Sequence, residues 1–114
     1  MCITIYHNPS WGKSRKTLQL LRDNGINPTI IEYNKNPPNV KELREICNIL
    51  GLAPSEIIRK GEKVYNELNI SNLGKDKDLI DVIIKHPQLM ERPIVIKGQK
   101  GIIGRPPEKV EKLL

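Results

Sequence analysis

The chain has 114 residues, which is long enough for one compact domain with a hydrophobic core and too short for two independent ones. Its 19 basic residues outnumber 13 acidic ones, so the formal net charge of +6 favours anionic partners in general. The basic residues are scattered along the chain, and only one tryptophan and three tyrosines accompany them. This pattern argues against a nucleic-acid-binding surface.

The sequence also argues against a membrane span and an export signal, because no apolar run approaches the ~20 residues that a span requires. Cys2 and Cys47 form no C-x-x-C pair, and together with His7 and His86 they show no zinc-ligand spacing. We therefore expect a cytoplasmic protein that binds no metal and no resident cofactor.

The first third of the chain predicts a strand, a helix and a second strand, at residues 3–6, 13–24 and 29–33. The Asn24-Gly25 pair marks the end of the helix, because glycine commonly follows the last helical residue. Two strands that are joined by one helix should be parallel, with a right-handed crossover between them.

A run of helical patterns follows the second strand. Asn39 can cap a helix over 40–50, and Gly51 closes this helix. Two short helices are expected at 54–59 and 64–68, and a longer one at 76–86. We expect residues 34–87 to form a helical insertion within a single domain of residues 1–114.

The C-terminal part predicts a β-hairpin and a last helix. Residues 93–97 and 101–104 have the pattern of strands, and Gly98-Gln99-Lys100 supplies the turn between them. Pro106-Pro107 begins a helix that continues to Leu114. The order β-α-β, helical block, β-β-α predicts an α/β fold with a mixed β-sheet, an arrangement that resembles the thioredoxin-like fold with a helical insertion.

The segment His7-Asn8-Pro9-Ser10-Trp11-Gly12-Lys13-Ser14-Arg15 lies between the first strand and the first helix. The unpaired N–H groups and the positive dipole end of a helix start favour an anion there. In thiol enzymes of the thioredoxin-like group, this position lowers the pKa of a nucleophilic cysteine. Here the position holds Trp11, which has no nucleophilic atom.

Further motifs follow this segment in a characteristic order: Asn36-Pro37-Pro38, Arg59-Lys60, His86-Pro87, Arg92-Pro93-Ile94-Val95 and Gly104-Arg105-Pro106. Together they resemble the arsenate reductase family that works with glutathione and glutaredoxin, and the resemblance covers nearly the whole chain. It implies the reduction of arsenate to arsenite. In that family a cysteine attacks the arsenic, glutathione resolves the adduct, and glutaredoxin returns the enzyme to its reduced state.

The resemblance assigns catalytic roles to three positions. Trp11 occupies the position of the nucleophilic cysteine and is inactive as such. His7 matches the histidine that helps to depress the pKa of that cysteine, and Ser14 matches the serine within the motif. Glutathione and glutaredoxin are the reductant and a protein partner if the chain is active.

The resemblance also implies an oxyanion pocket for arsenate, phosphate or sulfate. Guanidinium groups suit the tetrahedral oxygens of such ions, because they donate two parallel hydrogen bonds. Pro93 is expected to be the cis-proline opposite the active-site turn. The residues expected to bind the oxyanion are Arg59, Arg92, Arg105, Gly12, Lys13 and Ser14.

No other nucleophile replaces the missing cysteine convincingly. Cys2 precedes the first strand and should lie far from the turn, whereas Cys47 shares a helical stripe with Leu43 and Ile46 and should be buried. Ser10 offers a hydroxyl in the right loop, with His7 as the nearby base. Serine chemistry would be new for this motif.

Three functions remain open on the sequence. The first is an arsenate reductase-like protein that keeps its oxyanion pocket without the thiol chemistry. The second is a non-catalytic interaction module, because relatives of this fold act as transcription regulators that bind RNA polymerase. The third is an oxyanion sensor or carrier.

Overall fold

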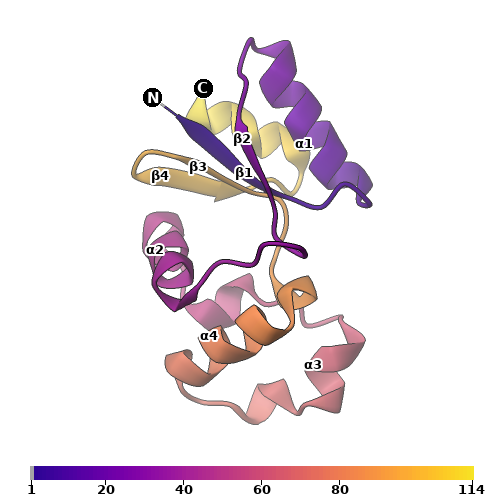
Figure 1. The fold of residues 1–114 in the computed structure, drawn as a ribbon, viewed down its shortest axis with the longest axis vertical. Helices are drawn as coiled ribbons and strands as arrows, with labels where there is room; N and C mark the ends of the chain where they lie inside the picture. The colour runs from indigo at the N-terminus through magenta and orange to yellow at the C-terminus, as the bar shows by residue number, and fades with distance from the viewer. Residues whose placement is uncertain (1) are drawn as a thin grey trace. The chain divides into compact units, whose positions relative to one another are not determined.

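The computed structural model describes residues 2–114 and divides the chain into two compact units (Figure 1). The sheet unit contains the residues up to Asn36 together with Arg92–Leu114, and the helical unit contains Pro37–Glu91. The description of the chain as one domain with an insertion over 34–87 stays a prediction. No helix within residues 2–114 is both long and apolar enough to cross a membrane.

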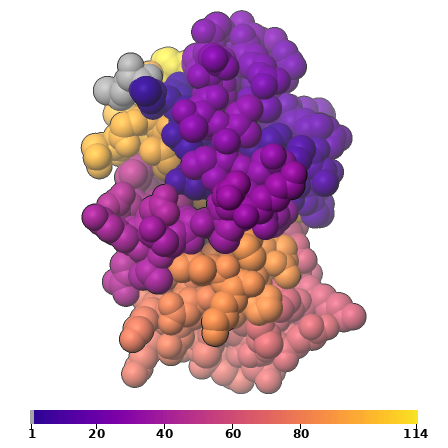
Figure 2. Space-filling model, viewed as in Figure 1, coloured from indigo at the N-terminus to yellow at the C-terminus, as the bar shows by residue number. Residues whose placement is uncertain are grey.

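Four strands form one mixed sheet in the order β2-β1-β3-β4: β1 (Ile3–His7), β2 (Thr29–Glu32), β3 (Ile94–Lys97) and β4 (Lys100–Ile103). β1 and β2 are parallel, whereas β1 and β3, and β3 and β4, are antiparallel. The predicted fold class is therefore confirmed. β2 is an edge strand, and the segment around it covers much of the visible face of the sheet unit (Figure 2).

Helix α1 (Gly12–Asp23) and the 3₁₀-helix η4 (Pro107–Leu113) pack side by side in the sheet unit (Figure 1). Ile3 and Ile5 alternate with Thr4 and therefore lie on one face of β1. That face meets the apolar stripes of both helices. The buried cluster contains Ile3, Ile5, Leu18, Leu21, Val95, Val110 and Leu113.

The helical unit is built from short elements: α2 (Val40–Leu50), η1 (Pro54–Ile57), α3 (Lys63–Glu67), η2 (Ile70–Asn72), α4 (Asp76–Lys85) and η3 (Pro87–Leu89). Asn39 and Glu42 form a reciprocal capping box at the start of α2. Gly51 ends α2 with a φ of 68°, in the left-handed region that favours glycine. Cys47 is buried on the apolar stripe of α2, as predicted.

Two predicted helices differ from the structure. The helix expected over 54–59 stops at Ile57, because Ile58 forms a β-bridge with Met90 and the Arg59 amide donates to the Leu89 carbonyl. The last helix is a 3₁₀-helix over Pro107–Leu113, with Pro106 as its N-cap residue, and it ends one residue before the predicted Leu114.

The β-hairpin turn is shorter than predicted. Lys97 pairs with Lys100, so only Gly98 and Gln99 form the loop. Gly98 has a φ of 61°, which a two-residue hairpin with glycine in the first central position requires.

Gly104 allows α1 to approach the segment that precedes β3. A Cβ atom at this position would lie 2.9 Å from Thr17 Oγ1 and 3.0 Å from Pro93 Cγ. Thr17 is fully buried, and its hydroxyl donates to the Lys13 carbonyl at 2.9 Å, so it has little freedom to move aside. A side chain at position 104 would therefore push the start of α1 away from Pro93.

We predict that Gly104→Ala lowers the free energy of unfolding by about 1–3 kcal/mol, because the added methyl group overpacks this contact. Gly61→Ala is the matched control, since a Cβ atom there has no neighbour within 4 Å, and its effect should stay within about 0.5 kcal/mol. Urea denaturation of both variants measures the difference. Equal stabilities would show that the approach at Gly104 is not tight.

Candidate functional site

A tight turn connects β1 to α1. The Trp11 amide donates to the Asn8 carbonyl at 3.1 Å, and the Ser10 amide donates to Asn8 Oδ1 at the same distance. The Arg15 amide then donates to the Trp11 carbonyl at 3.0 Å, which starts the helix. Trp11 is thus the N-cap residue, but its side chain caps no N–H group of the first turn.

His7 and Ser14 join the end of β1 to the first turn of α1. His7 Nδ1 lies 2.6 Å from Ser14 Oγ, and the same hydroxyl oxygen accepts the Asn8 amide at 3.0 Å. Both side chains are buried. These two hydrogen bonds hold the turn in place on its buried side. A hydroxyl group can make both, because it can accept one hydrogen bond from the Asn8 amide and form another with the imidazole.

Burial lowers the pKa of His7 below its usual value of 6.5, and the charges of Arg22 and Arg15 act in the same direction. Glu32, which lies opposite His7 in the parallel β1–β2 register, raises the pKa but does not outweigh burial. The ring is therefore neutral at pH 7. In a neutral ring, Nδ1 can accept a hydrogen bond from the Ser14 hydroxyl group.

Trp11 and Arg92 form a cation–π contact. The Arg92 Cζ atom lies 3.5 Å from the centroid of the indole ring, and Arg92 itself is only 5% exposed. Trp11 is 45% exposed, and its indole lies over the guanidinium of Arg92.

Arg92 and Arg105 extend from neighbouring backbone segments. The Gly104 amide donates to the Pro93 carbonyl at 2.8 Å, which holds the two segments together. The peptide bonds Arg92–Pro93 and Arg105–Pro106 are both cis. The second of these was not predicted from the sequence. Arg105 is exposed, in contrast to Arg92.

Comparisons with known proteins identify the family of the chain. The sequence profile of the ArsC family matches residues 6–113. The chain is 43% identical to an arsenate reductase of Haemophilus influenzae over the full length of both proteins, and 42% identical to one of Neisseria meningitidis over 98% of this chain and 97% of that protein. The structure of an arsenate reductase from Vibrio cholerae superposes with a TM-score of 0.96 at 41% identity, covering 100% of this chain and 98% of that one.

The chain belongs to the ArsC family. The match does not by itself settle the chemistry at position 11, which depends on the side chain that is present there.

The remaining predicted oxyanion ligands lie in different surroundings. Gly12 and Lys13 are exposed in the first turn of α1. Arg59 belongs to the helical unit, where its guanidinium forms an ion pair with Glu62. A common site of Arg59, Arg92 and Arg105 stays a prediction.

Arg15 is a positioning residue that was not predicted from the sequence. Its Nη1 atom donates to the Pro9 carbonyl at 2.9 Å, so the side chain reaches back over the turn that precedes its own helix. The Gly12-x-Ser14-Arg15 spacing could have indicated this role, since residues in one turn of a helix can reach the loop before it.

The turn between β1 and α1 carries positive charge and contains no thiol. The first turn of α1 has no acidic residue and carries Lys13 and Arg15. Cys2 is exposed at the start of the sheet unit, and Cys47 is buried in the helical unit, where burial raises the pKa of its thiol. Ser14 is fully buried. The turn can attract an anion but offers no exposed sulfur nucleophile.

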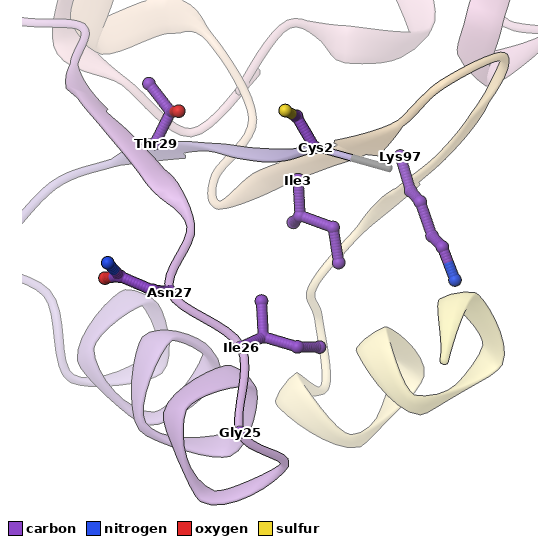
Figure 3. Close-up of a pocket in the computed structure, with 7 residues that line it drawn as sticks. All are labelled: Cys2, Ile3, Gly25, Ile26, Asn27, Thr29 and Lys97. Atoms are coloured by element: carbon purple, nitrogen blue, oxygen red, sulfur yellow. The ribbon is translucent and has the colours of Figure 1, made fainter.

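A separate cavity of about 690 Å³ lies at the opposite end of β1 and contains none of the predicted site residues. Its side chains do not converge on one point (Figure 3): Ile3 and Ile26 face each other, whereas Cys2 and Thr29 point away from them. The ammonium group of Lys97 donates to the Leu113 carbonyl at 2.8 Å. We therefore place the candidate site at the turn. Among residues 2–114 no cluster of three His, Cys, Asp or Glu side chains could hold a metal ion.

We predict that His7 makes stability pH-dependent below neutrality. Because its pKa is lowered in the folded state, the unfolded chain binds a proton that the folded chain does not, so stability falls as the pH drops through about 6.5 and levels off below the folded pKa. Wild type should therefore lose more stability between about pH 7.5 and about pH 5.5 than His7→Gln does. Denaturation at several pH values measures this difference.

A second variant checks the cause. Glu32→Gln removes the charge that raises the pKa of His7, so the imidazole should titrate at a still lower pH by NMR. A His7 that titrates at or above pH 6.5 in the wild type would contradict the dominance of burial.

Proposed function

We propose that this chain is an arsenate reductase-like protein that binds a small tetrahedral oxyanion at the start of α1 and does not reduce arsenate by the thiol route. The observation that carries this proposal is the pair of Trp11 and Arg92: an intact guanidinium beside a position with no nucleophile. Its close relatives named arsenate reductase supply the substrate class.

Two features support oxyanion binding. The start of α1 presents N–H groups that Trp11 does not cap, at the positive end of a 12-residue helix. Arg92 brings a permanent charge to the same turn from a position that is 95% shielded from water, where electrostatic attraction is stronger than at the surface. Arsenate, phosphate and sulfate share the tetrahedral geometry that these groups can bind.

The absence of a suitable thiol argues against reduction. A thiolate must attack arsenic before glutathione can resolve an adduct, and neither an indole nor a buried hydroxyl can take this role. Ser14 is fully buried and already bonded to His7 and Asn8. Glutaredoxin would be a partner only of a variant in which the thiol is restored.

Restoring the thiol tests the catalytic half of the proposal. We expect Trp11→Cys to reduce arsenate with glutathione and glutaredoxin at least ~100-fold faster than the wild type, because it returns the one missing group to a prepared turn. The assay couples glutathione oxidation to NADPH consumption. A wild type with ordinary reductase activity would contradict the proposal.

Two companion variants make this experiment specific. Trp11→Ser introduces a side chain of about the same size as cysteine but without a thiol, and this variant should remain inactive. The Cys2→Ala background removes the exposed native thiol, so that alkylation rates against pH report the new cysteine. The pKa of that new thiol should lie below the usual value for cysteine, because the helix start and Arg92 favour the thiolate.

Titration calorimetry tests the binding half. Wild type should bind arsenate, phosphate or sulfate, and Arg92→Ala should weaken the affinity by about 10-fold or more, as expected for the loss of charged hydrogen bonds. Arg44→Ala removes an exposed arginine of α2 and should leave the affinity unchanged. If none of the three anions binds to the wild type, the oxyanion proposal fails.

A protein-interaction module is the second candidate. Exposed tryptophan and arginine are the residue types that dominate binding energy in protein interfaces, and Trp11 is 45% exposed. Capture of RNA polymerase subunits at physiological salt, lost in Trp11→Ala, together with the absence of anion binding, would favour this function.

A further inference from the structure

The helical unit contains a cavity of about 170 Å³ that none of the predicted site residues lines. Three of its lining side chains, Ile58, Ile70 and Leu79, are at most 6% exposed and form an apolar floor. They come from three different segments, so the floor exists only in the folded unit. An apolar cavity of about 150 Å³ can hold a benzene molecule, and this cavity is therefore large enough for a small organic ligand.

Four polar side chains line the same cavity. Ser55, Lys60 and Ser71 are exposed and therefore lie at its mouth, whereas Tyr65 is partly buried. Their hydroxyl and ammonium groups can all donate hydrogen bonds. Of the described residues that line the cavity, only Lys60 is charged, and within residues 2–114 it forms no ion pair. The mouth of the cavity therefore favours an anionic group over a cationic one.

The turn that carries Lys60 is held in place by the rest of the helical unit. Residues 58 and 59 pair with residues 89 and 90 through a β-bridge and a hydrogen bond of 2.7 Å from the Arg59 amide. The side chains of Arg59 and Glu62 then form an ion pair across the turn. Because these contacts already order the backbone on both sides of Lys60, a ligand would find this wall of the cavity in place.

We propose that this cavity binds a small monocarboxylate with a compact apolar body, such as an aromatic or a branched-chain acid. The apolar body lies on the floor, where it is removed from water, and the carboxylate lies at the mouth beside Lys60. An inorganic oxyanion has no apolar part to bury there. This site is therefore distinct from the oxyanion site proposed at the start of α1, and the inference does not depend on that proposal.

An NMR titration of the full chain, labelled at its isoleucine and leucine methyl groups, tests the inference with benzoate and isovalerate. At least one of the two acids should give saturable shifts at Ile58, Ile70 and Leu79, with a Kd of about 1 mM or below. Acetate lacks the apolar body and benzyl alcohol lacks the charge. Each should bind at least ~10-fold more weakly than the better acid.

Three variants make the titration specific. Lys60→Gln should weaken the affinity for the acid by about five-fold, because it removes the charge at the mouth. Lys63→Gln removes an exposed lysine that does not line the cavity and should leave the affinity unchanged. Ser71→Phe places a ring at the mouth from an exposed position and should abolish the shifts.

An excess of phosphate separates the two sites. Phosphate should leave the affinity for the acid unchanged, since the two ligands bind in different places. Displacement of the acid by phosphate, or shifts confined to the start of α1, would overturn the inference. If neither acid gives saturable shifts at the three methyl-bearing floor residues, the inference also fails, whereas the proposed function is unaffected.

Discussion

The close approach of α1 to the backbone around Pro93 is the constraint on which the candidate site depends. Gly104 makes this approach possible, since its missing Cβ leaves room for Thr17 on one side and Pro93 on the other. The Gly104 amide then bonds to the Pro93 carbonyl. Because the helix start and the residue before Pro93 are held together in this way, Trp11 and Arg92 come into contact.

The second constraint acts within the turn. The hydrogen bond between His7 and Ser14 holds the end of β1 against the first turn of α1. Arg15 stabilises the same turn from its exposed side by donating a hydrogen bond to the Pro9 carbonyl. Neither of these hydrogen bonds involves the side chain at position 11, so they form whether or not a thiol is present there. The framework of an ArsC-family site can therefore persist in a chain whose position 11 holds an indole, and family membership and activity are separate questions for this protein.

Local pattern and motif order predicted much of the fold. The parallel pair of β1 and β2, the hairpin of β3 and β4, and α2 with its Asn39 cap all follow from periodicity and capping residues. One error occurs where tertiary contacts compete with local preference. Residues 58 and 59 leave the predicted helix because they pair with the segment around Met90, which is distant in the sequence.

The sequence by itself determined the family, the order of the elements and the absence of a nucleophile at position 11, because these depend only on which residues occur and in what order. Only the tertiary structure decided what the indole does. A sequence does not state which side chains meet across a fold, so it could not show that Trp11 lies over Arg92 and stays half exposed. The same holds for His7, whose lowered pKa comes from burial in the folded sheet unit.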